Sequence, residues 1–558
     1  MRPVSPNYKI LKNLMSKSRR FNLPSEIDYI IIYTFLYKYC SDNLKDHFLM
    51  VVKDKEMTLD EAYNDGYCHE LLKEDAMHLF GYHIENPDAF IDEVINKKYS
   101  DRFFLTDFFR VFPQNIQFAE NSKDKQYFDL LFRTMKDELN IKEYEFDNEM
   151  NFAIKEIIFS ISKLDLFDNQ FEFRRVFDVI SNSRMMHIHS NPDYISQILS
   201  TLISCEKKSI KSAYDPFMKN GSSLMNLSDL CETGVTYYGK EADKLTYLYT
   251  IARFFINIFY LNHVVFKNED ATQSIDIEGA SFDAILSKIP VSIKNYHSSN
   301  KNQSFEIAKR SKRGELEDML LEKFGMDSNS FEQDSALNLA LENLLEKMDV
   351  EKDSEEKFTG EYESLKDSEF LFLINLIDSL KDDGIMAISI SQNFLYKSSL
   401  ETLRKYLAFE KNYIDTIISI PEELGRTKPE VVMVFKKNRT TDDILFIDMS
   451  KDYQTQKSPM LFPGLFRRNL ILSNDTINKM RDVFINRLTI TKFSNVVKLG
   501  EIEKNNFNLA VSRYVDTFEG EFVKLRDLTF EKREIDENVK RLNLKIEKMM
   551  DELNIRFK

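Results

Sequence analysis

Two short segments of the chain place polar side chains where a small ligand could bind. In residues 211–228, KSAYDPFMKNGSSLMNLS, an apolar strand is predicted to end near Tyr214 with Asp215 at its end, and a turn containing Gly221 then opens a helix. Such a turn directs backbone N–H groups and a helix N-terminus toward a ligand. A single turn of this kind is common, so the segment needs a second feature beside it.

The second segment, residues 235–257, supplies an acid. Its sequence, VTYYGKEADKLTYLYTIARFFIN, predicts a strand that ends on Glu241 and a helix that follows. An acidic residue at the end of a second strand is well placed to accept both ribose hydroxyls of a nucleoside cofactor. Because many helices also begin with an acid, a purely structural role for Glu241 stays open.

The elements around these segments indicate an α/β fold. From about residue 170 to 450, short apolar runs of strand length alternate with amphipathic helices, which is typical of a mainly parallel sheet. Ligands bind such sheets at the carboxyl ends of the strands. The predicted strands lie in KSAYDP, VTYYGKE, FDAILS, GIMAISIS, YIDTIISIP, EVVMVFKK and DILFIDM.

The rest of the chain has different sequence patterns. Residues 1–165 are rich in aromatic helical segments and nearly lack glycine, and we interpret them as a helical domain without catalytic residues. The α/β domain is predicted over 166–470, with a charged insertion at 298–366, and a connecting region over 471–518 precedes a helical tail at 519–558. Residues 301–366 contain 17 Asp/Glu and 10 Lys/Arg, a composition unsuited to a DNA-binding arm.

The tail carries a regular apolar seam. Its apolar residues are spaced 4, 3, 4, 3 and 4 apart, which is a heptad pattern that predicts a coiled-coil-like helix. Packing on its own domain and binding a partner helix both fit this pattern, and co-purification with a chain truncated before the seam would separate them. The seam consists of Ile535, Val539, Leu542, Ile546, Met549 and Leu553.

Composition excludes several classes of protein. The 558 residues contain no apolar run of membrane-spanning length and no secretory signal at the N-terminus, so a cytoplasmic protein without a membrane partner is expected. The four cysteines are far apart, and no acid or cysteine flanks the His-Ile-His at 187–189, so no metal site is expected. With a net charge of −15, either DNA is not the partner or another subunit supplies much of the contact.

Taken in order, these segments resemble the modification (M) subunits of type I restriction-modification enzymes, which are adenine-N6 DNA methyltransferases. That family has a Thr-Pro, an Asp-Pro-x-Cys-Gly-Ser-Gly loop for S-adenosylmethionine (SAM), a Gly-x-Glu for its ribose, and an Asn-Pro-Pro-Phe/Tyr loop for the target adenine. The segments LYKYCSD at 36–42 and NNFNLAVSRYVDT at 505–517 also look like the family's. The resemblance covers nearly the whole chain and implies a helical N-terminal domain, a Rossmann-like SAM-dependent methyltransferase domain and a helical tail.

The resemblance also implies roles for individual residues. Asp215 and Gly221 match the cofactor loop, Glu241 matches the ribose-binding acid, and Asp270 matches the acid near the adenine ring of the cofactor. Asn191-Pro192 stands where the family has Thr-Pro. The implied partners are a specificity subunit that reads DNA, a second M copy and, in some systems, a restriction subunit.

Two motifs depart from the family. Lys288-Ile289-Pro290-Val291 replaces Asn-Pro-Pro-Phe, in a register fixed by the preceding FDAIL and the following serine. In the family the Asn side-chain and proline backbone carbonyls accept both N–H bonds of the adenine amine, and the aromatic ring stacks on the flipped base. A charged lysine has three donors and no acceptor, and valine has no ring. In the cofactor loop, Lys219-Asn220 replaces Gly-Ser, which puts a side chain where the backbone should approach the ligand, although Lys219 could pair with the SAM carboxylate.

Three hypotheses follow. The first is an M-subunit-like pseudoenzyme of a restriction-modification defence system, a structural or regulatory component of a DNA-binding complex with impaired catalysis. The second is an active adenine-N6 methyltransferase with an atypical acceptor loop, which predicts bound SAM and methylated DNA. The third is a protein-binding scaffold without DNA contact. Calorimetry with SAM and a comparison of host DNA methylation with and without the protein distinguish them.

Overall fold

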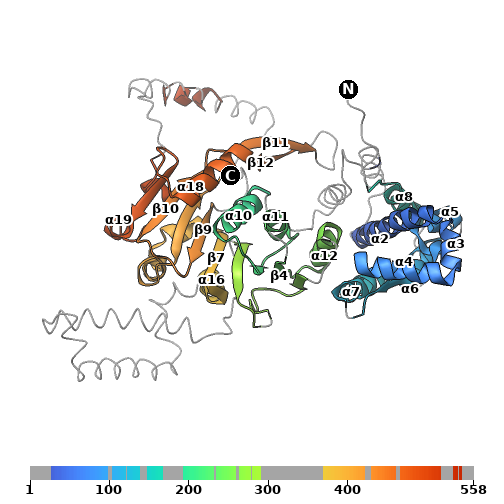
Figure 1. The fold of residues 1–558 in the computed structure, drawn as a ribbon. Helices are drawn as coiled ribbons and strands as arrows, with labels where there is room; N and C mark the ends of the chain where they lie inside the picture. Colours follow the sequence, from blue (N-terminus) through green and yellow to red (C-terminus); the bar gives the residue numbers. More distant parts are fainter. Residues whose placement is uncertain are drawn as a thin grey trace, which may run out of the picture. The chain divides into compact units, whose positions relative to one another are not determined.

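The structure is a computed structural model of the chain (Figure 1). It describes the following residues: 10, 27–98, 104–120, 122–138, 148–166, 193–231, 234–258, 263–277, 279–290, 368–421, 429–459, 466–516, 532–533, 535–537 and 539–542. Asn191, Pro192, Val291, the His-Ile-His at 187–189 and the predicted insertion at 298–366 lie outside the described residues.

The N-terminal part is helical, as predicted, and its core is aromatic. The long helix α2 (Ile27–Asp54) is buried along most of its first half, and the Tyr37 ring stacks on Phe112 with ring centroids 4.0 Å apart. A two-stranded antiparallel sheet, β1 (Tyr82–Ile84) with β2 (Ile116–Phe118), was not predicted. The other helices here are α3 (Leu59–Asn64), α4 (Gly66–Leu79), α5 (Ile91–Lys98), α6 (Phe104–Asn115), α7 (Lys123–Glu138) and α8 (Asn148–Ser162).

Side-chain caps fix where two of these helices begin. Thr58 forms a capping box with Glu61 at the start of α3, and the Asp65 side chain accepts a hydrogen bond from the Cys68 backbone N–H at the start of α4. Each cap satisfies N–H groups that have no partner within their helix.

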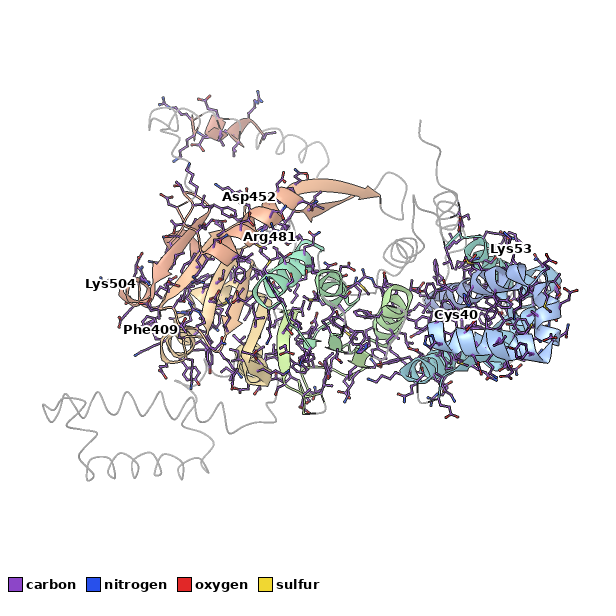
Figure 2. All side chains as sticks on the ribbon, in the orientation of Figure 1. Cys40, Lys53, Phe409, Asp452, Arg481 and Lys504 are labelled. Carbon is purple, nitrogen blue, oxygen red and sulfur yellow. The ribbon has the colours of Figure 1, made fainter. Side chains whose placement is uncertain are left out.

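Cys40, labelled in Figure 2, lies buried on α2, and all four cysteines are free thiols.

A nine-stranded sheet of order β13-β10-β8-β9-β7-β6-β3-β4-β5 forms the α/β part. Five of its strand pairs are parallel and three, β10 with β13, β7 with β9 and β8 with β9, are antiparallel. The prediction of a mainly parallel sheet is confirmed. The strands are β3 (Ser212–Asp215), β4 (Thr236–Lys240), β5 (Val264–Lys267), β6 (Phe282–Lys288), β7 (Leu380–Ser391), β8 (Ile414–Ser419), β9 (Glu430–Lys436), β10 (Asp443–Asp448) and β13 (Ser494–Lys498).

Both faces of this sheet are covered, which explains the continuous apolar runs that predicted its strands. Neighbouring residues point to opposite faces, so Leu445 joins one hydrophobic core and Phe446 the other. The first core also contains apolar residues of α10 (Asp193–Glu206), α11 (Ser222–Leu230), α12 (Lys244–Ile258) and α18 (Asn474–Asn486). The second contains residues of α16 (Ser368–Ser379), α17 (Glu401–Lys405) and α19 (Leu499–Lys504).

The remaining described elements are few. Strands β11 (Gln454–Pro459) and β12 (Phe466–Ile471) pair antiparallel in a sheet of their own. Residues 516–558 form a separate unit, in which Ile535, Val539 and Leu542 are helical and about half exposed, at 61%, 49% and 55%. Among the described residues, no helix is both long and apolar enough to cross a membrane. The domain boundaries and the coiled-coil pairing of the tail stay predictions.

Candidate functional site

The turn after β3 requires a glycine at one position. Gly221 precedes α11 with a φ of 72°, which is left-handed backbone that favours glycine. A Cβ atom there would lie 2.8 Å from both Phe254 and Thr250 on α12. The turn 216–221 therefore packs closely against α12. This packing positions Asp215, which directly precedes the turn at the end of β3.

Asp215 is fully buried with one unused oxygen. Its Oδ1 accepts hydrogen bonds from the Ser287 hydroxyl at 2.7 Å and the Phe217 backbone N–H at 3.0 Å. Within the described part of the chain, its Oδ2 has no hydrogen-bond partner. Burial raises the pKa of Asp215 to about 7, although Ser287 and Phe217 oppose the rise. A buried carboxyl oxygen without a partner fits a ligand that donates a hydrogen bond, such as an amine.

Glu241 lies at the matching place on the neighbouring strand. Strands β3 and β4 are parallel, with Asp215 opposite Gly239, and Glu241 follows the last residue of β4. Glu241 is 9% exposed, and its Oε1 accepts a hydrogen bond from the Asp243 backbone N–H. The structure thus brings Asp215, Gly221 and Glu241 to one edge of the sheet.

Asp270, the fourth described residue predicted to bind the cofactor, follows β5, which pairs parallel with β4. Asp270 is exposed in the turn after β5, and its side chain accepts a hydrogen bond from the Thr272 backbone N–H. Its neighbour Asn268 is the residue that reaches the site, because its amide donates to the Glu241 carbonyl at 2.8 Å. Asn268 therefore holds the backbone behind Glu241, a role that the sequence alone did not indicate.

Lys219, the first altered residue of the cofactor loop, has a strained backbone and a largely buried ammonium. Its φ of 50° is in the left-handed region. Burial lowers the pKa of Lys219, and so does the positive charge of Lys288, while Asp215, Glu430 and Glu241 oppose this. Among the described residues, its ammonium has no hydrogen bond or ion pair. The lysine therefore adds positive charge inside the site without a direct counter-ion.

Replacing Lys219 with glycine is expected to stabilise the protein by about 1 kcal/mol, because the left-handed backbone no longer carries a side chain. Urea denaturation measures the change. Glu56→Gly is the matched control, since Glu56 has a similar φ of 56° but is exposed. If Lys219→Gly raises the free energy of unfolding more than Glu56→Gly does, the difference measures the cost of burying the ammonium. A loss of stability at position 219 would instead show that the nearby carboxylates stabilise Lys219.

Lys288, the first residue of the predicted acceptor loop (residues 288–291), forms an ion pair that the sequence did not predict. The Lys288 ammonium at the end of β6 lies 2.7 Å from Oε2 of Glu430, the first residue of β9. The Ser389 hydroxyl on β7 donates to the same oxygen at 2.9 Å. No local pattern could have paired Lys288 with Glu430, because β9 reaches the site only through the antiparallel pairing of β7 with β9.

The next two residues of the loop continue the sheet. The Ile289 backbone N–H donates to the Ser389 carbonyl at 2.9 Å, and the Ile289 side chain is fully buried. Pro290 is partly exposed. Proline at position 289, as in the family motif, would lack this N–H donor. The chain at position 289 is thus bonded as a continuation of β6.

These features define a class of protein. The mainly parallel sheet carries acids at the ends of two neighbouring strands and a glycine turn after the first of them, which is the arrangement of a Rossmann-like methyltransferase fold. The type I restriction-modification methyltransferase subunit from Streptococcus thermophilus superposes with a TM-score of 0.64 at 21% identity, covering 92% of this chain and all of that one. A modification subunit of a putative type I restriction enzyme from Vibrio vulnificus gives 0.53 at 12% identity, covering 90% and 94%.

Sequence comparisons agree with the fold. A family model described as N-6 DNA Methylase matches residues 339–521. The chain is 23% identical over 560 residues to the type I restriction enzyme MpnII methylase subunit of Mycoplasma pneumoniae, covering 95% of this chain and 92% of that protein. A stretch of 161 residues is 35% identical to the MjaVII methylase subunit of Methanocaldococcus jannaschii, covering 28% and 27%. The chain is therefore similar, in sequence and in fold, to the modification (M) subunits of type I restriction-modification enzymes, which confirms the resemblance seen in its motifs.

Proposed function

We propose that the chain acts as an M-subunit-like pseudoenzyme that keeps the methyltransferase fold but transfers methyl groups very weakly or not at all. In this proposal it is a structural or regulatory component of a DNA-binding restriction-modification complex. A specificity subunit and a second M copy are its partners, with a restriction subunit in some assemblies. The observation that carries the proposal is the Lys288–Glu430 ion pair in the acceptor loop.

The chemistry of the target explains why this pair matters. The exocyclic amine of adenine is a poor nucleophile because its lone pair is delocalised into the ring, so it needs hydrogen-bond acceptors. A charged Lys288 presents only donors to it. Glu430, the neighbouring acceptor, already pairs with Lys288 and accepts a hydrogen bond from Ser389 at one oxygen. The site therefore offers positive charge where electron density on nitrogen must increase.

The cofactor half of the site fits SAM better than the acceptor half fits adenine. Asp215, with one unpartnered buried oxygen, would accept a hydrogen bond from the amino group of SAM, and Glu241 would accept those of the ribose hydroxyls. The close approach at Gly221 packs the turn that follows Asp215 against α12. Lys219 would pair with the SAM carboxylate. When bound, SAM would supply the methyl group of the reaction.

A second candidate function is an active adenine-N6 methyltransferase in which Glu430 serves as the acceptor. Glu430 favours this alternative because its side chain is 11% exposed and lies at the acceptor loop. In that case the carboxylate would have to exchange the Lys288 ammonium for the adenine amine. Breaking a well-buried ion pair costs several kcal/mol unless the new partner replaces it, which makes this the weaker candidate.

Sequencing of host DNA for N6-methyladenine decides between the two. We expect no motif to lose methylation when the gene for this chain is deleted, because the acceptor loop does not support the transfer. A Glu430→Gln copy is the matched control for the second candidate. A motif that loses methylation on deletion, regains it with the intact copy and fails to regain it with Glu430→Gln would overturn the proposal and establish Glu430 as the acceptor.

A further inference from the structure

Two histidines and a glutamate converge in the helical N-terminal part, far along the chain from the methyltransferase motifs. His69 lies on α4, His83 on β1, and Glu85 directly follows β1. The two Nε2 atoms are 3.2 Å apart, and His69 Nε2 lies 3.9 Å from Glu85 Oε2. One ligand atom from each of the three residues falls within 4.8 Å of the others. No similar grouping of three such residues occurs elsewhere in the described ranges.

The spacing of these atoms fits coordination of a small ion. Ligand atoms about 2.0–2.1 Å from a tetrahedral zinc ion are about 3.3 Å from one another. The 3.2 Å between the two imidazole nitrogens is close to this ligand–ligand distance, and the 3.9 Å from His69 Nε2 to Glu85 Oε2 is somewhat longer. We propose that His69, His83 and Glu85 form a site for a divalent transition-metal ion, with Zn²⁺ as the expected occupant.

The donor atoms of the three groups suit a cation. His83 is fully buried and His69 is partly buried, and each neutral imidazole can offer one ring nitrogen to a metal ion. Glu85 supplies a carboxylate, whose Oε1 pairs with Lys73. Two imidazole nitrogens and one carboxylate are a donor set that suits zinc.

The surroundings orient these ligands. Lys73 lies 2.6 Å from Glu85 Oε1 and so holds that oxygen, which leaves Oε2 on the side of His69. The Tyr63 ring of α3 stacks parallel to His83 with ring centroids 6.0 Å apart, and fixes the plane of the imidazole. His69 and Glu85 are 22% and 26% exposed, so an ion can enter from solvent and keep water as a fourth ligand. Lys73 opposes the ion by its charge, so we expect moderate rather than tight binding.

The alternative is a metal-free pair in which one imidazole donates a hydrogen bond to the other. Both arrangements place the two nitrogens at about the same distance, so the distance alone does not separate them. They differ in one consequence. A bound ion connects α4 to the β1–β2 sheet and raises the thermal stability of the chain, whereas a hydrogen-bonded pair gives no response to added metal.

Calorimetry of the full chain with Zn²⁺, after chelator treatment, tests the site. We expect one ion per chain bound, a higher Tm with Zn²⁺, and a tetrahedral absorption signature when Co²⁺ replaces it. His69→Ala, a change at a partly exposed position, should weaken binding at least ~10-fold, and Glu85→Gln should weaken it less. His78→Ala is the matched control, because His78 is an exposed histidine of the same helix.

Two results would overturn the proposal. One is the absence of any Zn²⁺ binding or Tm change in a chain whose circular dichroism shows it to be folded. The other is binding that survives His69→Ala but is lost when His187 and His189 are both replaced by alanine, which would move the site to that pair. Because these measurements do not involve methyl transfer, they stand whether or not the proposed function is correct.

Discussion

Asp415→Ala is expected to lower the free energy of unfolding by about 3–5 kcal/mol, because it leaves buried positive charge without its counter-ion. The Asp415 Oδ1 atom lies 3.1 Å from Arg439, 3.2 Å from Arg487 and 3.4 Å from Lys436. The side chains of Asp415 and Arg439 are only 4% and 2% exposed. Urea denaturation measures the loss.

Asp382→Ala is the matched control for this change, since Asp382 is an exposed aspartate that forms no ion pair within the described residues. We expect it to alter stability by less than about 0.5 kcal/mol. An Asp415→Ala chain as stable as the control would mean that the two arginines find other acceptors, for example Asp443, which already pairs with Arg487 at 2.6 Å.

The stabilisation that Asp415 provides is expected to decrease at low pH. Burial alone would raise the pKa of Asp415, but the charges of Lys436, Arg487 and Arg439 outweigh it and bring the pKa below its usual value. A carboxyl whose pKa is lowered by folding stabilises the fold above its unfolded pKa of about 3.9. This stabilisation is lost as the pH falls through the folded pKa. The difference between Asp415→Asn and the unchanged chain should therefore shrink below about pH 4.

Restoring the family's acceptor motif should produce the largest change in activity. We expect the variant Lys288→Asn, Ile289→Pro, Val291→Phe and Glu430→Gln to raise methyl transfer to DNA on the order of 10²-fold, the typical value of one well-placed hydrogen-bonding group at a reacting centre. Glu430→Gln is included because Glu430 would otherwise lose the ammonium that it pairs with. Incorporation of labelled methyl groups from SAM into duplex DNA measures the rate.

This variant also has a predictable cost. Proline at position 289 removes the N–H that donates to the Ser389 carbonyl, so we expect a loss of about 1 kcal/mol in stability. Glu430→Gln alone is the control, and it should leave methyl transfer at background. If the unchanged chain already transfers methyl groups as fast as the restored one, Lys288 is no obstacle and the pseudoenzyme proposal fails.

Part of this site could be predicted from the sequence for a clear physical reason. The strands are buried on both faces, so their residues form continuous apolar runs that stand out from the helices. Asp215 and Glu241 each follow such a run, and parallel strands bring their carboxyl ends to one edge of the sheet. The meeting of these two acids was therefore implied once the strands were recognised.

Other parts could not be predicted, because they depend on pairing between distant segments. Glu430 reaches Lys288 only because β9 runs antiparallel beside β7, an exception in a mainly parallel sheet. His69 and His83 come together because α4 packs against β1, although their separation in the sequence is not a metal-ligand spacing. A local sequence pattern predicts which residues of an element are buried. It does not predict which distant side chain forms an ion pair with them.

The parallel pairing of β6 with β7 has one consequence for how this chain can vary. Parallel neighbours must be joined by a crossover, which leaves at one end of the sheet and returns at the other. The predicted acceptor loop, which begins at the end of β6, is the first part of that crossover. The free-energy cost of closing a connection rises by only about 0.6 kcal/mol for each doubling of its length. The sheet thus tolerates chain added after residues 288–291, so an insertion there can lengthen the protein without disturbing the strands on either side.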